Sequence, residues 1–143
     1  MNGAVFLTQT DTTIGFVSQQ ASKLDQIKKR PSHKHYIKAV NSLKTLQHFT
    51  RIPNRYKNQV RRSTKTTFIL PKGDSYRVIR QKHHLLLLDR LKWVYTTSAN
   101  LSNQAYDETF AREHADVIIE PIYGDKTASQ IFKITNHTIK RIR

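Results

Sequence analysis

"TTSANLS", residues 96–102, is a run of small hydroxyl and amide side chains that directly follows an apolar stretch, Trp93 to Tyr95. The apolar residues predict a buried strand over 94–97, and the polar run marks its end. Asn, Ser and Thr are common in turns, so one interpretation is a polar turn. The other is a loop that binds a polar ligand where the strand ends.

The composition indicates a folded protein. The chain has 143 residues, enough for one domain, 1–143, with its own core. It contains no cysteine, which excludes disulfides, thiolate metal sites and a cysteine nucleophile. No apolar run reaches membrane-spanning length, and the start "MNGAVFLTQTD" lacks the basic segment of a signal peptide. We therefore expect a cytoplasmic protein without a membrane partner.

The net charge of +15 is unevenly distributed along the chain. Thirteen Lys or Arg and one acid lie between Lys23 and Lys65, whereas six acids and one Arg lie between Leu101 and Asp125. A basic half of this density attracts polyanions such as RNA or nucleotide phosphates. The alternative is a basic surface that only faces solvent.

Short apolar runs alternate with short amphipathic segments along the whole chain. Strands are predicted at 4–7, 36–40, 66–70, 76–80, 94–97, 116–119, 130–134 and 138–142. Helices are predicted at 22–30, from Ser42 onward, and at 53–62, 84–93 and 107–114. This mixture predicts a single α/β domain built around one twisted mixed sheet with short flanking helices.

Four polar motifs follow or precede these elements in a distinctive order. They are "TDTTIG" (10–15), "KKRPSHK" (28–34), "TSANLS" (97–102) and "ASQI" (128–131). Their order and spacing resemble the YrdC-like family, whose active members are threonylcarbamoyl-AMP synthases. The family patterns are P-T-[DE]-T-x-Y-G, K-x-R-P-x-x-K-P, P-x-T, S-A-N-x-S-G and P-S-T or P-S-x-I.

The match covers nearly the whole chain but departs from the family at several positions. Lys28 and Arg30 correspond to K-x-R, and Ser98 and Asn100 to S-x-N. The family has proline where this chain has Gln9, His35, Lys65 and Ala128. It has tyrosine in place of Ile14 and glycine in place of Asn103. The chain is also shorter than typical members.

The resemblance implies an open, strongly twisted α/β sheet with a deep, positively charged hollow. It implies a reaction that joins L-threonine, bicarbonate and ATP into threonylcarbamoyl-AMP with release of pyrophosphate. That product serves the modification of adenosine 37 in certain tRNAs, and RNA binding has been associated with the hollow. The implied partners are threonine, bicarbonate, ATP, tRNA or double-stranded RNA, and other tRNA-modification proteins.

The motif residues have side chains that suit this chemistry. Fixed cations at Lys28 and Arg30, assisted by Lys34, would stabilise the charge that grows as pyrophosphate leaves. The alternative is a basic helix end that complements the helix dipole. Substrate or nucleotide contacts are expected from Thr10, Thr12, Lys34, Thr67, Arg77, Ser98, Asn100 and Ser129. Turns at the ends of strands are the alternative for the hydroxyl and amide residues, and Arg80 competes with Arg77 for the family's strand arginine.

No protein nucleophile and no protein-bound metal are expected. The threonine amine would attack bicarbonate, and the carbamate would attack the α-phosphate of ATP. Asp11 is the one acid among the motifs, so Mg²⁺ is expected to be carried mainly by the nucleotide. The histidines, His33 and His35 included, are interpreted as surface residues.

Two hypotheses of different class follow. The first is a threonylcarbamoyl-AMP synthase, and the alternative is a non-catalytic RNA-binding module with the same fold. The basic segment 53–62 lies outside the small-molecule motifs and leaves little apolar surface to bury, so we expect an exposed helix. Arg55, Arg61 and Arg62 are its predicted RNA contacts.

Overall fold

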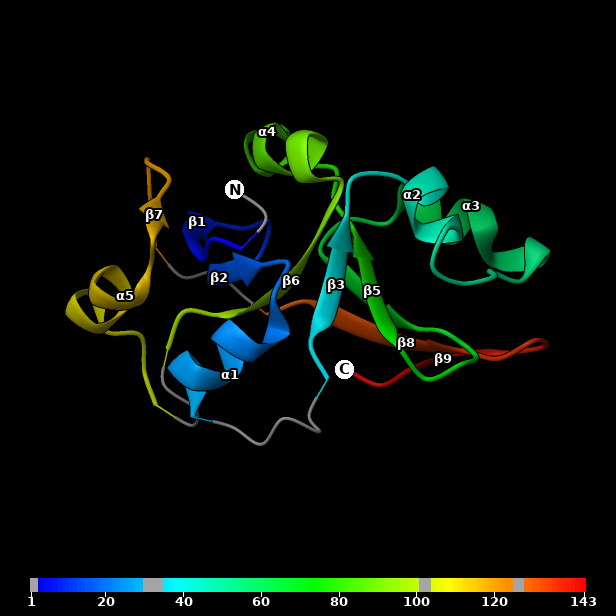
Figure 1. Cartoon of the computed structure of the whole chain (residues 1–143). Coiled ribbons are helices and arrows are strands. Elements are labelled where there is room, and N and C mark those ends of the chain that lie inside the picture. The colour runs from blue at the N-terminus through cyan, green and yellow to red at the C-terminus, as the bar shows by residue number, and fades with distance from the viewer. Residues whose placement is uncertain (1–2, 30–34, 101–103, 125–127) are drawn as a thin grey trace.

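The protein is built around one mixed sheet (Figure 1). The computed structural model describes residues 3–29, 35–100, 104–124 and 128–143, and within these ranges the sheet has nine strands in the order β7-β1-β2-β6-β3-β5-β4-β8-β9. The strands are β1 (Phe6–Gln9), β2 (Ile14–Ser18), β3 (Ile37–Val40), β4 (Thr66–Ile69), β5 (Ser75–Val78), β6 (Trp93–Ser98), β7 (Val117–Ile118), β8 (Gln130–Ile134) and β9 (Ile139–Arg141). The pairs β1/β7, β3/β5 and β4/β8 are parallel and the other neighbours are antiparallel, so the predicted mixed sheet is confirmed.

Short helices cover the two faces of the sheet. They are α1 (Ala21–Lys28), α2 (Leu43–Gln47), the 3-10 helix η1 (Asn54–Tyr56), α3 (Lys57–Arg62), α4 (Lys82–Leu91) and α5 (Glu108–His114). Neighbouring strand residues point to opposite faces, and the helices divide accordingly. Val17 packs in a cluster with Leu88 of α4, whereas its neighbour Phe16 packs in a cluster with Leu24 of α1.

A third core cluster lies under α2 and α3. Leu46 and Val60 of these helices pack in one cluster with Val40 and Val78 of the central strands. The next residue inward on β3, Ala39, belongs instead to the cluster under α4. The sheet is therefore buried from both sides at its centre, as its nearly continuous apolar strands suggest.

Local signals explain where several helices begin and end. Ser42 caps α2 by accepting a hydrogen bond from the backbone N–H of Thr45 at 3.1 Å. Asp107 caps α5 in the same way through the N–H groups of Thr109 and Phe110. At the end of α4, Lys92 adopts a positive φ of 73°, and Trp93 starts β6. The helix predicted at 84–93 therefore begins and ends two residues earlier.

One strand was not predicted, one interpretation was wrong and other predictions need adjustment. Strand β2 was not predicted, because Ile14–Ser18 is buried throughout and shows no apolar–polar alternation. The histidines were expected at the surface, but His84 is only 1% exposed on the inner side of α4. The helix predicted at 53–62 is divided into η1 and α3. Among the described helices, none has the length and apolar character needed to cross a membrane.

Candidate functional site

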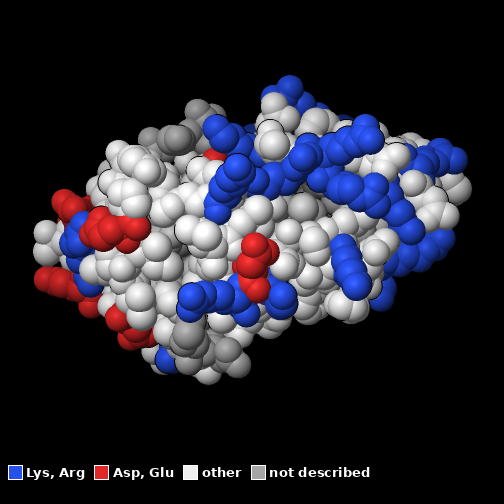
Figure 2. Space-filling view, turned by 90° about the horizontal axis from the view of Figure 1, so that it is seen from above, with Lys and Arg blue, Asp and Glu red and all other residues white. Residues whose placement is uncertain are grey.

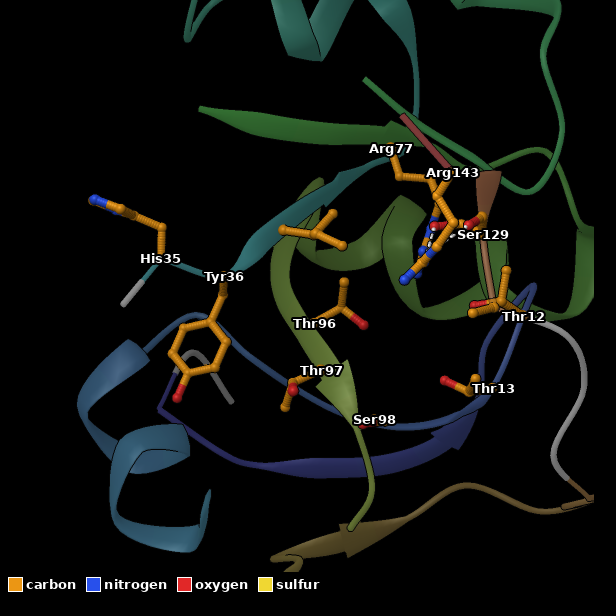
Figure 3. Close-up of a pocket in the computed structure, with 12 residues that line it drawn as sticks. Thr12, Thr13, His35, Tyr36, Arg77, Thr96, Thr97, Ser98, Ser129 and Arg143 are labelled. Atoms are coloured by element: carbon orange, nitrogen blue, oxygen red, sulfur yellow. Dashed lines mark hydrogen bonds between the residues drawn. The ribbon is translucent and has the colours of Figure 1, made fainter. Parts of the chain in front are cut away.

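A cavity of about 260 Å³ opens on the α4 face of the sheet (Figure 3). Its walls come from the β1–β2 turn, from β3, β5 and β6, from Ala128 and Ser129, and from the C-terminal residue. The register explains why these strands contribute, because Arg77 pairs with Ala39 and Thr96 pairs with Ile37, and both pairs therefore face the same side. The polar groups of the cavity thus come from segments that are far apart in the sequence.

A buried ion pair stands at the back of this cavity. Nε of Arg77 lies 3.2 Å from Oδ1 of Asp11, and the two residues are 4% and 5% exposed. Burial raises the pKa of the Asp11 carboxyl, and the charge of Arg77 opposes that shift. Burial likewise lowers the pKa of Arg77, against the effect of Asp11. Because Asp11 is approached by the Nε edge of the guanidinium, the orientation of Arg77 in the cavity is restricted.

A second guanidinium faces the same space from the chain end. Nε of Arg143 donates to the carbonyl oxygen of Ser129 at 2.9 Å, and Nη2 lies 3.4 Å from the Ser129 hydroxyl. Thr67 and Ser129 share a buried hydrogen bond of 2.8 Å between their hydroxyls. Figure 3 shows Arg77, Arg143 and Ser129 close together on one side of the cavity. The sequence did not single out Arg143, because it is one of many basic residues near the C-terminus.

Lys28 holds the end of β6 and the residues Ala99 and Asn100 that follow it. Nζ of Lys28 donates to the carbonyl oxygen of Ser98 at 2.9 Å and to Oδ1 of Asn100 at 2.8 Å. The Ser98 hydroxyl donates to the same Oδ1 at 2.6 Å, and Nδ2 of Asn100 donates to the carbonyl of Gln104. Lys28 is 4% exposed, so this lysine joins the end of α1 to the end of β6. The sequence assigned Lys28 and Asn100 separate roles, and the structure brings them into contact.

The threonine-rich turn divides into a part that holds the turn together and a part that lines the cavity. Thr10 forms part of the turn itself, because its hydroxyl donates to the carbonyl of Thr13 at 2.6 Å and accepts from the backbone N–H of Thr12 at 3.2 Å. Thr12 and Thr13 line the cavity. A Cβ on Gly15 would lie 2.8 Å from Cγ2 of Thr10, so only glycine fits beside this turn.

Two positions that depart from the family patterns have clear structural roles. The side chain of Gln9 is buried and holds the segment after β7, since its Nε2 donates to the carbonyl of Gly124 and its Oε1 accepts from the backbone of Tyr123. Ile14 is 2% exposed within β2 and packs in the core cluster with Leu24. An isoleucine side chain has no polar group, so it cannot make the hydrogen bond that a tyrosine hydroxyl could make.

The two candidate strand arginines lie in different places. Arg77 lines the cavity, whereas Arg80 is exposed and donates from Nη1 to the carbonyl of Arg62 at 2.8 Å. Arg30, Lys34 and Asn103 lie outside the described residues. Thr13 and Thr96 also line the cavity; both lie within the quoted polar motifs, but neither was chosen as a candidate contact.

The predicted RNA contacts are also separated in space. Arg61 and Arg62 line a groove next to α2, whereas Arg55 lines a different hollow with Arg51 and His137. The three arginines are exposed, as expected. Within the described part of the chain, no group of three or more His, Asp or Glu side chains is arranged to hold a metal ion.

Known proteins resemble this chain in sequence and in fold. The Sua5_yciO_yrdC family model, described as "Telomere recombination", matches residues 1–143. The uncharacterized protein MG259 of Mycoplasma genitalium is 32% identical over 103 residues, a match that covers 71% of this chain and 22% of that protein. This chain therefore spans less than a quarter of the length of that curated relative.

Solved structures share the architecture at low sequence identity. P. abyssi Sua5 complexed with L-threonine superimposes with a TM-score of 0.81 at 18% identity, covering 99% of this chain and 50% of Sua5. E. coli YciO gives a TM-score of 0.79 at 19% identity, covering 99% of this chain and 82% of YciO. These two structures have the same fold as this chain, and the family model matches the chain over its whole length. The protein therefore belongs to the Sua5/YciO/YrdC family.

Proposed function

We propose that this protein is an L-threonylcarbamoyladenylate synthase-type enzyme that forms threonylcarbamoyl-AMP from threonine, bicarbonate and ATP for tRNA t6A modification. The observation that carries the proposal is the cavity in which Arg77 and Arg143 face the hydroxyls of Thr12 and Ser129. Two cations and several neutral hydrogen-bonding groups suit a substrate with carboxylate, carbamate and phosphate groups. The family match and the complex of P. abyssi Sua5 with L-threonine support this substrate class.

The size of the cavity suggests how the substrates divide between the cavity and the adjoining loop. About 260 Å³ is slightly below the usual range for small-molecule pockets. The threonine and carbamate part would occupy this space, and the nucleotide would extend toward Ser98, which lines the cavity rim, and the Lys28–Asn100 contact. Arg30 and Lys34 of the adjacent motif are proposed as further phosphate contacts.

The proposed reaction needs positioning and charge stabilisation rather than a protein nucleophile. The threonine amine attacks the bicarbonate carbon with loss of water to give a carbamate, and a carbamate oxygen then attacks the α-phosphorus as pyrophosphate leaves. Preoriented cations stabilise the charge that develops on the phosphates, and the Asp11–Arg77 ion pair provides such preorientation.

A divalent ion would accompany ATP rather than bind to the protein alone. Asp11 already contacts Arg77, and among the described residues no three or more His, Asp or Glu side chains are grouped to hold a metal ion. This side-chain set fits Mg²⁺ carried on the nucleotide phosphates, where the ion would neutralise phosphate charge.

A pyrophosphate-release assay tests the proposal. The protein is incubated with ATP, Mg²⁺, threonine and bicarbonate, and threonine or bicarbonate is omitted in the two controls. Release that needs both co-substrates is the expected result. Absence of release at high protein concentration, with the protein shown to be folded, would contradict the enzyme assignment.

A non-catalytic RNA-binding module is the second candidate. One observation favours it, namely that Ile14 is buried in β2 where the family motif has tyrosine, so that a polar ring hydroxyl is lacking. Under this alternative the cavity would bind ligands without turnover. The same assay separates the two candidates, because only the enzyme releases pyrophosphate.

A further inference from the structure

A second concave surface lies away from the cavity, between α2, the end of α3 and the start of α4. We call it the α2–α3 groove and define it by Asn41, Lys44, Arg61, Arg62, Arg80 and Leu85. Its volume is about 630 Å³, more than twice that of the cavity. The groove begins at Asn41, directly after β3, whereas the cavity is lined by Ile37 at the start of the same strand. Val78, the last residue of β5, and Ile79 line the groove and directly follow Arg77 of the cavity, so the two sites use neighbouring residues but different side chains.

The charge of the groove has one sign. Lys44, Arg61, Arg62 and Arg80 are all exposed, and none of the residues that line the groove is acidic. Figure 2 shows Lys and Arg side chains gathered over much of the face seen from above, while most of the visible acids lie at the opposite end of the molecule. Asp89 stands at the rim, where its Oδ1 accepts from Nδ2 of Asn41 at 3.3 Å. A surface of this kind attracts an extended anion.

Two of the arginines are already oriented by hydrogen bonds within the protein. Nη1 of Arg80 donates to the carbonyl of Arg62 at 2.8 Å, which ties the end of β5 to the end of α3. Nη1 of Arg61 donates to Oδ1 of Asn58 at 2.7 Å. A guanidinium has five N–H donors, so each arginine keeps donors that suit the oxygens of a phosphate group.

We propose that the α2–α3 groove binds the phosphodiester backbone of structured RNA. The groove presents four exposed cations and no acid, a set that suits successive phosphates of a polymer. Gln47 adds a neutral, exposed amide group that can contact a ribose hydroxyl. The choice of RNA over DNA rests on the proposed function, whose product serves the modification of an RNA.

Only two of the three arginines predicted to contact RNA belong to the α2–α3 groove. Arg61 and Arg62 join Lys44 and Arg80, whereas Arg55 faces a separate hollow. Because the groove and the cavity use different side chains, RNA bound in the groove would leave the cavity open to small substrates.

A salt titration with matched variants tests the groove. The test variant carries Lys44→Gln, Arg61→Gln and Arg62→Gln, and the control carries Lys133→Gln, Lys140→Gln and Arg141→Gln on the β8–β9 hairpin. All six side chains are exposed and both variants lose the same charge. Arg80 is kept because of its bond to the Arg62 carbonyl. Binding of a fluorescein-labelled RNA hairpin is followed by anisotropy between 50 and 200 mM salt.

The groove variant should bind the hairpin more weakly, and its log–log salt slope should flatten by roughly 2 to 3, at 0.7–0.9 per lost phosphate contact. The control variant on β8 and β9 should change the salt slope by less than about 1. Equal losses in both variants would overturn the proposal, since they would reflect net charge rather than the groove. Equal affinity of the wild type for a DNA hairpin of the same sequence would overturn the assignment to RNA.

The outcome is distinguishable from failure of the proposed function. Thermal melts of both variants show whether they fold, and pyrophosphate release by the groove variant should equal that of the wild type. A wild type that releases no pyrophosphate contradicts the synthase, whereas unchanged salt slopes in the groove variant contradict the groove.

Discussion

Nε of Arg77 lies 3.2 Å from Oδ1 of Asp11, and the side chains of both residues are buried. The pair connects the β1–β2 turn with β5, two segments that do not neighbour each other in the sheet. This contact restricts the orientation of the Arg77 side chain in the cavity. It also connects the two halves of the sheet.

Asp11→Asn should destabilise the protein strongly. The substitution leaves the Arg77 guanidinium buried without its counter-charge, which costs on the order of 3–5 kcal/mol when one partner of a buried pair is removed. Urea unfolding measures the loss. The double variant Asp11→Asn with Arg77→Met should recover much of it, because no unpaired charge remains; a single variant as stable as the wild type would contradict the role of the pair.

Stability should fall in acid because of His84. Burial lowers the pKa of His84 from 6.5 to about 3, and the nearby Arg77 and His83 add to the shift. The unfolded chain binds the proton near pH 6.5 while the folded protein does not, so this contribution is complete above pH 6.5 and is lost as the pH falls toward 3. At 1.36 kcal/mol per pKa unit the loss is at most roughly 5 kcal/mol.

His84→Leu isolates this contribution from that of the carboxylates. Neither ring nitrogen of His84 has a hydrogen-bond partner among the described residues, so an apolar side chain of similar size should be tolerated. The free energy of unfolding of the variant should depend less on pH between 6.5 and 3 than that of the wild type. Parallel pH profiles for the two proteins would show that His84 titrates normally.

Asn100→Asp should weaken ATP binding while the fold is retained. A carboxylate oxygen can still accept from Nζ of Lys28 and from the Ser98 hydroxyl, as Oδ1 of Asn100 does. The added negative charge would repel the phosphates, so we expect ATP affinity to fall roughly tenfold or more, or about 1.4 kcal/mol. Calorimetric titration with ATP and a thermal melt check the two parts; normal affinity would indicate that the loop is only a turn.

Arg143→Gln should reduce ATP affinity or turnover, and Arg141→Gln provides the matched control. Arg143 contacts Ser129 and lines the cavity, whereas Arg141 is an exposed residue of β9 outside it. Loss of one oriented cation at the reacting centre lowers the rate on the order of 10²–10³-fold. If both variants show the same kcat/KM for ATP, Arg143 has no special role.

Arg30→Ala should lower turnover on the order of 10²–10³-fold, because Arg30 is proposed as a cation that contacts the phosphates. A substitution that removes a proposed ligand contact should affect stability little, so the variant should melt like the wild type. Pyrophosphate release measures the effect, and near-wild-type release would remove Arg30 from the proposed phosphate site.

The sequence predicted well those features that neighbouring residues decide. The strands at β3, β4, β6 and β8 were found from apolar periodicity, and the helix that starts at Ser42 has the cap that its residue type predicts. The helix at 107–114 likewise starts at its acidic cap. The distribution of charged residues along the chain predicted a basic and an acidic part, and Figure 2 shows basic and acidic side chains on different parts of the surface.

The sequence predicted the candidate site only in pieces. Arg77 and Ser129 were chosen as motif residues, but their proximity to Arg143 depends on the parallel pairing of β4 with β8 and on the hairpin that returns the chain end along β8. Strand β2 was missed because residues buried on both faces lose the alternation that identifies a strand.

By itself, then, the sequence determined the short apolar strands, the helix caps, the uneven charge and the order of the motifs, because none of these depends on which distant segments meet. Only the tertiary structure decided that Asp11 meets Arg77, that Lys28 holds Asn100, that His84 is buried and that Arg61 shares a groove with Lys44. These contacts join distant segments, and they form only when the packing of the whole sheet selects one strand order and one register.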